Sequence, residues 1–319
     1  CWFVVWGGSM LSKLNIGLTP WNFSDLSAGS LVDQARFAEE LGYDSIWLPE
    51  NHFGPNAIPD PLTLLAAVAG GTEQIRLGTT SYLLTLRNPL QAAEQVAVLD
   101  QLSKGRLILG VGRGYAPDML KAFHVPPAQK RRIFSWALNI MQEAWSGNAG
   151  TLADDAENGV LVYPLPFQKP WPPIWVAAFG PKALAQAGKL GLPYLCSPME
   201  SLAKLQENFD VHRREVESAG LNLPETVPLM RSVFVCRDSK ILKRIKHEVQ
   251  DKTENTRLKE GDIIDDWVII GEPDEVSDKI EQYMEELGMN YLIASRIRVS
   301  GIDARMLEES VSLLAHVSK

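Results

Sequence analysis

The feature that most constrains the fold is an alternation of short apolar segments with longer amphipathic ones, in eight pairs between Leu14 and Val317. The short segments are aliphatic and β-branched, which is typical of parallel strands covered on both faces. The longer segments repeat apolar residues at helical spacing, and several are opened by proline or closed by glycine. This pattern predicts a (β/α)8 barrel of the TIM type. An open six-stranded sheet would require the predictions of the sixth and eighth strands to be wrong.

The expected elements can be placed along the chain by these patterns. The predicted strands cover residues 14–18, 45–48, 75–79, 107–111, 174–177, 193–195, 228–235 and 291–294. The predicted helices cover residues 31–41, 62–69, 89–102, 131–145, 181–190, 201–219, 239–259, 274–287 and 304–317. Two stretches, 147–173 and 239–268, look like insertions, and a small hairpin is predicted at 159–163 within the first.

The first nine residues, CWFVVWGGS, differ from the rest of the chain and precede Met10. They lack the basic region of a signal peptide. We interpret residues 1–9 as an extension or a segment added upstream of the natural start, and residues 10–319 as one barrel domain, for which the length is normal. A short edge strand or an interface arm is the alternative for residues 1–9.

Charge and cysteine content exclude several classes of function. The net charge is −8, and the basic run at 240–247 is followed at once by acidic residues, so no nucleic-acid surface is expected. No stretch is long and apolar enough to suggest a membrane span. The three cysteines have neither metal-binding nor disulfide spacing, which favours a cytoplasmic location.

In a parallel α/β barrel, function resides in the residues that follow each strand. Here they are aromatic and thinly charged, with no HExxH motif, GxSxG elbow, phosphate-binding Walker loop or complete GxGxxG fingerprint. No metal site is therefore expected. Arg113, between two glycines, and the helix start at 180–182 are candidate phosphate contacts. Such a pocket suits a planar, phosphorylated redox cofactor.

The chain resembles the bacterial luciferase-like flavin monooxygenase family. The resemblance is carried by LGYDSIWLPENHF (41–53), IRLGTTSYLL (75–84), RNPLQAAEQVAVLDQLSKGRLILGVGRG (87–114), IWVAAFGPKALAQAGKLG (174–191) and GEPDEVSDKIEQYMEELGMNYLI (271–293). It implies a barrel that binds FMN, or in one branch a deazaflavin coenzyme, at its mouth.

The resemblance also assigns residues to the cofactor. A non-proline cis peptide between Thr80 and Ser81 would support the flavin ring. The phosphate contacts would come from Arg113 and Arg131, although Arg131 could instead be an exposed helix charge. The remaining cofactor contacts would be Phe179, Gly180, Pro181 and Lys182.

The segment after the second strand departs from the luciferase pattern. Luciferase-type members read Glu-His-His-Phe there, with the first histidine tied to catalysis, whereas this chain reads Glu50-Asn51-His52-Phe53. Asparagine cannot act as a general base at neutral pH, so Asn51 can only orient and form hydrogen bonds. His52 aligns with the one histidine of deazaflavin-dependent relatives and could face the flavin, or be a packed, backbone-bonded side chain. The other four histidines are expected to be solvated.

The resemblance implies a flavin-dependent monooxygenase (EC 1.14) that uses reduced FMN and O2 on an unidentified small organic substrate. A separate flavin reductase would supply the reduced FMN. The alternatives are a deazaflavin-dependent oxidoreductase that transfers hydride, and a flavin-binding protein without turnover. Candidates to line the substrate side are Phe53, Tyr82, Met119, Trp267 and Phe179.

Two predicted helices are apolar around much of their circumference, more than an exposed helix tolerates. They are LTLLAAVA (62–69) and the segment 92–99. Barrels of the family that the chain resembles usually pair through these helices. A homodimer is therefore predicted.

Overall fold

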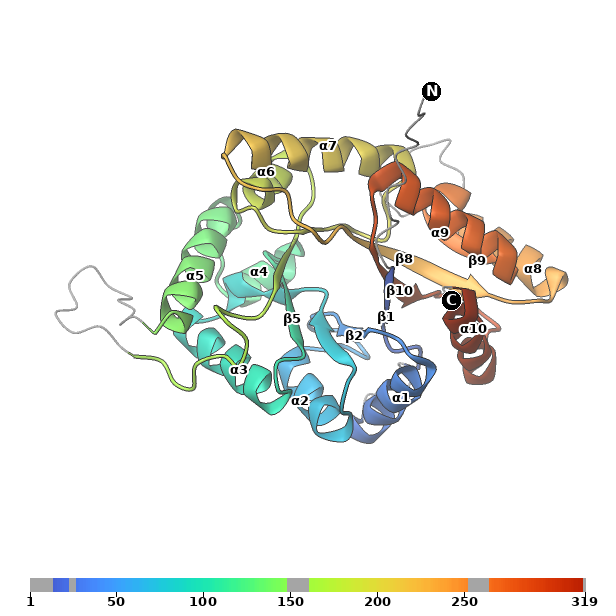
Figure 1. Cartoon of the computed structure of the whole chain (residues 1–319), viewed down its shortest axis with the longest axis horizontal. Helices are drawn as coiled ribbons and strands as arrows, with labels where there is room; N and C mark the ends of the chain where they lie inside the picture. Colours follow the sequence, from blue (N-terminus) through green and yellow to red (C-terminus); the bar gives the residue numbers. More distant parts are fainter. Residues whose placement is uncertain (1–13, 23–26, 148–160, 252–263, 318–319) are drawn as a thin grey trace, which may run out of the picture.

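The structure is a computed structural model that describes residues 14–22, 27–147, 161–251 and 264–317. Helices surround a central ring of strands (Figure 1). The strands are β1 (Asn15–Leu18), β2 (Ser45–Leu48), β3 (Arg76–Thr79), β4 (Tyr82–Leu83), β5 (Leu107–Gly112), β6 (Ile174–Ala177), β7 (Tyr194–Leu195), β8 (Pro228–Val235), β9 (Val268–Gly271) and β10 (Tyr291–Arg296). The helices are α1 (Ala28–Leu41), α2 (Pro61–Gly71), α3 (Pro89–Leu102), α4 (Pro117–Ala122), α5 (Lys130–Trp145), α6 (Pro181–Lys189), α7 (Leu202–Ser218), α8 (Ser239–Asp251), α9 (Pro273–Leu287) and α10 (Ala304–Val317).

The strands pair in parallel, in the order β7-β6-β5-β3-β2-β1-β10-β8-β9. The predicted α/β barrel is confirmed, since the eight predicted strands correspond to β1, β2, β3, β5, β6, β7, β8 and β10. The ring closes where β7 faces β8, and side chains rather than a strand ladder join them there. The Met230 amide donates to Cys196 Sγ at 3.4 Å, and the buried Arg231 guanidinium donates to the Glu200 carbonyl at 2.8 Å.

Tryptophans fill the inside of the barrel. Trp47 of β2 is fully buried and stacks on Trp175 of β6, with ring centroids 4.9 Å apart. Its indole needs the glycine of the neighbouring strand, because a Cβ at Gly78 would lie 2.1 Å from Trp47 Cε3. The interior is therefore a packed core, and open space for a ligand is left at the ends of the strands.

Local sequence signals explain several helix boundaries. The Ser27 hydroxyl accepts the Ser30 amide, so α1 begins earlier than its apolar pattern indicates. Asp60 caps α2 in the same way, and Glu272 and Glu275 form a capping box at α9. Within the described residues, no helix has both the length and the apolar character that crossing a bilayer requires.

The structure corrects the expected element map in several places. It adds β4, α4 and β9, and β9 begins at Val268, inside the predicted 239–268 insertion. β9 pairs with residues 232–235 of β8, on the edge opposite the one that pairs with β10. In the predicted hairpin at 159–163, residues 161–163 form no strand, and the rest lies outside the described residues. Residues 1–9 and 252–259 also lie outside them.

Candidate active site at the mouth of the barrel

Two adjoining cavities open at the carboxyl ends of the strands. One, of about 550 Å³, contains Arg113 and His52, and we call it the Arg113 cavity. The other, of about 510 Å³, contains Trp267 and Arg296, and we call it the Trp267 cavity. Thr80, Tyr115, Pro198 and Met230 line both. The shared walls make them two lobes of one cleft, and each lobe has the size of a small-molecule site.

Arg113 is held in place directly after β5. Its side chain is 7% exposed, and its guanidinium donates to Gln186 Oε1 at 2.6 Å and to the Ala177 carbonyl at 2.7 Å. Burial, and after it the positive charge of Arg131, lower the pKa of Arg113 to about 10. The group nevertheless stays charged at neutral pH. A buried cation with fixed orientation is suited to hold an anion.

Three other cations line the Arg113 cavity: Lys130, Arg131 and Lys182. The Lys130 ammonium donates to the Gly114 carbonyl at 3.3 Å, and burial and then its two arginine neighbours lower the pKa of Lys130. Of the described residues that line this cavity, Glu50 is the one carboxylate, and it is already bound to Arg87. The concentrated positive charge therefore favours a phosphate or another multiply charged anion.

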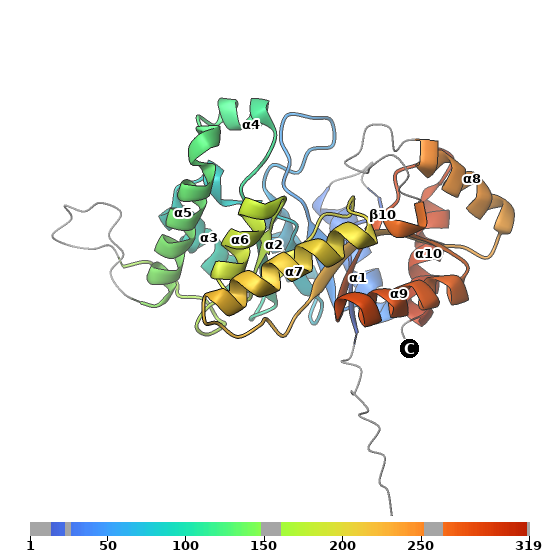
Figure 2. The same ribbon diagram turned by 90° about the horizontal axis from the view of Figure 1, so that it is seen from above.

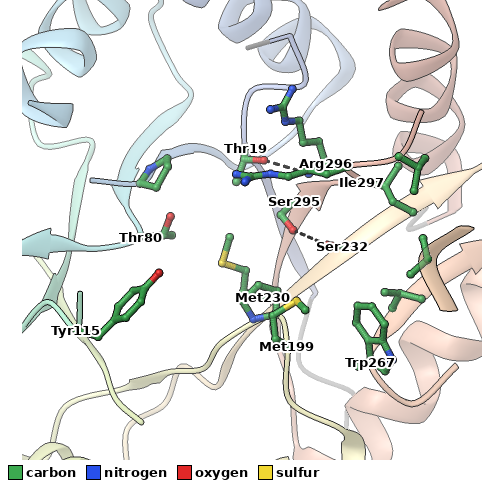
Figure 3. A pocket seen from close by; sticks show the side chains of 16 residues that line it. Thr19, Thr80, Tyr115, Met199, Met230, Ser232, Trp267, Ser295, Arg296 and Ile297 are labelled. Atoms are coloured by element: carbon green, nitrogen blue, oxygen red, sulfur yellow. Dashed lines mark hydrogen bonds between the residues drawn. The ribbon is translucent and has the colours of Figure 1, made fainter. Parts of the chain in front are cut away.

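The segment after β3 lies where the two cavities meet, and Thr80 of this segment lines both. The Thr80–Ser81 peptide bond is cis, as the family resemblance implied. The Thr80 hydroxyl oxygen is buried and has no hydrogen-bonding partner within the described residues. Thr80 lies across the cleft from Trp267, with Met230 and Met199 between them (Figure 3). A ligand with polar ring atoms, such as a flavin, would fit here, because it could satisfy this hydroxyl group.

The residues predicted to be catalytic both line the Arg113 cavity, but they are held differently. His52 is mostly buried, and its Nε2 lies 2.9 Å from Glu50 Oε1. The side-chain oxygen of Asn51, Oδ1, accepts a hydrogen bond from the backbone amide of Ile58 at 2.6 Å. The backbone amide of Asn51 donates to the Ile58 carbonyl at 3.0 Å. The carbonyl of the Asn51 side chain therefore holds the loop between β2 and α2.

The other predicted site residues divide between the cleft and its surroundings. Phe179, Lys182 and Met119 line the Arg113 cavity, and Trp267 lines the other one. Gly180 and Pro181 begin α6 beside the cleft, without lining it.

Two residues predicted to line the substrate side are placed elsewhere. The Tyr82 ring is 1% exposed under the Arg87 guanidinium, and its hydroxyl group donates to Gln95 Oε1 at 3.1 Å, outside both cavities. Phe53 is 71% exposed and stacks on Phe123, which follows α4. The segment between β2 and α2 and the helix α4 project from the same end of the barrel (Figure 2). Neither side chain is placed as the sequence predicted, because β4 turns Tyr82 away from the cleft and Phe53 packs on Phe123.

The sequence analysis missed most of the Trp267 cavity. Its further lining side chains include Met199, Met230, Ser232, Ser295 and Arg296. Most of them belong to β8, β10 and the segment after β7, which the ring brings together. The rule that ligands bind where strands end could have drawn attention to Arg296, the last residue of β10. Among the described residues, no group of three or more His, Cys, Asp or Glu side chains is placed to hold a metal ion.

Comparison with known proteins shows what this fold is similar to. The family model described as luciferase-like monooxygenase matches residues 19–242. The uncharacterized protein y4wF of Sinorhizobium fredii is 36% identical over 173 residues, which are 53% of this chain and only 51% of that protein. The chain therefore spans about half the length of this relative.

Two longer matches are to proteins that are described with different cofactors. An F420-dependent glucose-6-phosphate dehydrogenase of Amycolatopsis mediterranei is 28% identical over 293 residues, covering 82% of this chain and 87% of the enzyme. The solved structure of the oxygenating constituent of 3,6-diketocamphane monooxygenase from Pseudomonas putida, in complex with FMN, has a TM-score of 0.78. It is 20% identical and covers 95% of this chain and 97% of its own, so it supports the fold alone.

Proposed function

Because the chain belongs to the luciferase-like monooxygenase family, we propose that it is an FMN-dependent monooxygenase that oxidises a small organic substrate with O2. The observation that carries the proposal is the buried Arg113, held by two hydrogen bonds in a cavity with three other cations. FMN carries a phosphate at one end and a planar ring at the other. The Arg113 cavity offers a match for the first, and the Thr80–Ser81 segment beside it offers a match for the second.

In this proposal, the Arg113 cavity binds the cofactor and the Trp267 cavity binds the substrate. Arg113, Arg131 and Lys182 would hold the phosphate, and Thr80 and Ser81 would lie against the ring. The Trp267 cavity would take the substrate, because its thioether and indole side chains suit the apolar part of a small organic molecule and the Arg296 side chain, which also lines it, suits a polar group. When bound, the cofactor supplies the electron transfer and the reaction with O2. A separate flavin reductase would provide it in reduced form.

A second candidate is a deazaflavin-dependent oxidoreductase that transfers hydride. It is supported by the 28% identity with an F420-dependent dehydrogenase along most of both chains. It is also supported by Asn51, which stands where luciferase-type members carry their catalytic histidine and is occupied in holding its loop. In this case His52, at the wall of the Arg113 cavity, would exchange a proton with the substrate.

Replacement of Arg113 tests the cofactor site. We expect Arg113→Ala to weaken FMN binding about 10- to 100-fold, because a charge-assisted hydrogen bond to a phosphate contributes roughly 1.5–3 kcal/mol. The measurement is a fluorescence titration of the purified protein with FMN and, separately, with F420. Arg132→Ala is the matched control, since Arg132 follows Arg131 on α5 and contacts Gln129 outside the cavity.

The titrations also separate the two candidates. Tight binding of FMN with oxygen consumption on reduction supports the monooxygenase, and tight binding of F420 alone supports the second candidate. Binding without any oxygen or substrate consumption would leave a flavin-binding protein without turnover. Equal affinities of Arg113→Ala and the unmodified protein for both cofactors would refute the proposed site.

We also propose that two copies of the chain pair through α2 and α3. A surface groove of about 250 Å³ lies between these helices, and Val98 and Leu102, which line it, are 43% and 56% exposed. A second copy that covers this apolar strip would remove it from water. Light scattering should give a dimer for the purified protein and a monomer for Leu102→Asp. A monomer at micromolar concentration before any substitution would refute the pairing.

A further inference from the structure

A buried carboxylate connects His52 to the segment that carries the Thr80–Ser81 peptide. The Glu50 side chain is fully buried, and its Oε1 lies 2.8 Å from Arg87 Nη1 and 2.9 Å from His52 Nε2. Its Oε2 accepts the Leu83 amide at 2.9 Å. Arg87 in turn donates to the Leu83 carbonyl at 2.8 Å and lies over the Tyr82 ring. Glu50 thus joins the loop after β2 to the loop after β3.

These contacts determine which nitrogen of His52 carries the proton. Arg87 and the Leu83 amide both donate to the Glu50 carboxylate, and an ionised carboxylate can only accept hydrogen bonds. His52 must therefore donate from Nε2. In the neutral ring, Nδ1 then has a lone pair. Within the part of the chain that the structure describes, Nδ1 has no hydrogen-bonding partner, and the ring lines the Arg113 cavity.

Aromatic contacts restrict rotation of the same ring. The His52 ring packs edge-on against Phe123 with centroids 4.8 Å apart, and lies 5.6 Å from the Phe53 ring. Phe53 itself adopts a left-handed backbone conformation, with φ of 63°, that brings it to this place. The two phenylalanine rings and the Glu50 carboxylate together limit how far the His52 ring can rotate.

We propose that Glu50, supported by Arg87, is a positioning residue that fixes His52 as its Nε2–H tautomer, so that Nδ1 is the atom that exchanges a proton in the cleft. For the identity of the reaction, the inference rests on the second candidate of the proposed function, hydride transfer from a substrate alcohol. The substrate hydroxyl would give its proton to Nδ1, which converts the neutral imidazole to imidazolium. The hydride on the same carbon would pass to the bound deazaflavin, so that the alcohol becomes a carbonyl compound. Glu50 would stay ionised throughout and stabilise that cation, and the proton would leave again from Nδ1 to water or product.

The test is a spectroscopic measurement of the tautomer. A long-range 1H–15N correlation spectrum of the labelled full chain distinguishes protonated from unprotonated ring nitrogens for each of the five histidines. A His52→Asn variant assigns the signals of His52. We expect the unmodified protein to show the proton on Nε2 at pH values where the ring is neutral. A proton on Nδ1 would overturn the inference, and this measurement needs no further variant.

Variants then test the role of the carboxylate. Glu50→Met combined with Arg87→Met removes both charges and keeps similar shapes, a replacement that proteins often tolerate. We expect His52 to lose its preference for one tautomer in this double variant and to keep it in Arg87→Lys. Glu285→Gln, an exposed acid on α9, is the matched control and should leave His52 unchanged.

The outcomes separate this inference from the proposed function. Arg113→Ala, the variant that tests the cofactor site, should leave the His52 tautomer unchanged, since Arg113 contacts Gln186 and the Ala177 carbonyl and neither His52 nor Glu50. An unchanged His52 tautomer in the folded double variant would overturn the role of Glu50. A tautomer that responds as expected in a protein that binds neither FMN nor F420 would support the role of Glu50 and refute the cofactor proposal.

Discussion

At the scale of single residues, the site depends on how its charged groups are held as well as on which groups they are. Arg113 donates to a glutamine of α6 and to a carbonyl of β6. The same Gln186 donates to the Arg131 carbonyl at 3.0 Å and to the Ser135 hydroxyl at 2.6 Å. Gln186 therefore joins α5 to α6 and orients the guanidinium before any ligand arrives, which reduces the entropy lost on binding.

We predict that Gln186→Leu weakens FMN binding about 3- to 10-fold, because one neutral hydrogen bond contributes roughly 1 kcal/mol. The guanidinium stays in the cavity but loses one of its two anchors. Affinity is measured by fluorescence titration, and thermal unfolding checks that the fold is kept. Gln206→Leu, an exposed site on α7, is the control. An affinity equal to that of the control would show that Gln186 does not orient Arg113.

At the scale of elements, the helix α7 buries a titratable side chain that the sequence analysis expected to be solvated. His212 was expected to be solvated, but it is 5% exposed, and its Nε2 lies 2.9 Å from the Leu192 carbonyl. Burial lowers the pKa of His212, and the hydrogen bond to Leu192 opposes this effect in part. The spacing could have shown this burial, since His212 lies three residues after Phe209 and four before Val216, on the apolar face of α7.

Because His212 is buried, the free energy of unfolding should depend on pH, and the sign of this dependence can be derived. Unfolded histidine has a pKa near 6.5, and the folded value is lower, so the unfolded chain binds the extra proton first. The free energy of unfolding should therefore fall as pH drops below about 6.5. We predict a weaker fall for His212→Gln, which keeps a donor for Leu192 but does not titrate. Urea unfolding at pH 7.5 and 5.5 measures this effect.

The control for this prediction is an exposed histidine. His124 lies at the surface with φ of 56°, a conformation that asparagine adopts readily, so His124→Asn should unfold with the pH dependence of the unmodified protein. A His212→Gln variant with that same dependence would contradict the assignment of the effect to His212.

At the scale of the whole molecule, the sequence was sufficient for the barrel and for one lobe of the cleft. Eight strand patterns predict a ring, and the end of the fourth predicts where Arg113 lies. The Trp267 cavity could not be predicted in this way, because it forms only when β8 and β10 meet in register, with Ser232 opposite Ser295. The two residues of β4 are too few to show a period, and β9 begins inside the stretch that was interpreted as an insertion.

The packed interior offers a test of the barrel as a unit. A methyl group at Gly78 would lie 2.1 Å from Trp47 Cε3, and Trp47 cannot move aside because it stacks on Trp175. We predict that Gly78→Ala lowers the free energy of unfolding by about 1–3 kcal/mol, the usual cost of overpacking. Adding Trp47→Phe should recover part of this loss, because the smaller ring leaves room for the methyl group, so the two effects should not add.

Urea unfolding of both single variants and the double variant gives the coupling between the two sites. Gly70→Ala on α2 is the control, since a Cβ there meets nothing within 4 Å. Alanine is the better helix former by roughly 1 kcal/mol, so this variant should be as stable as the unmodified protein or more so. Strictly additive losses at Gly78 and Trp47 would mean that the indole does not fill the space next to β3. The barrel would then need another source for the rigidity that holds the strand ends, and with them Thr80 and Arg113, around the cleft.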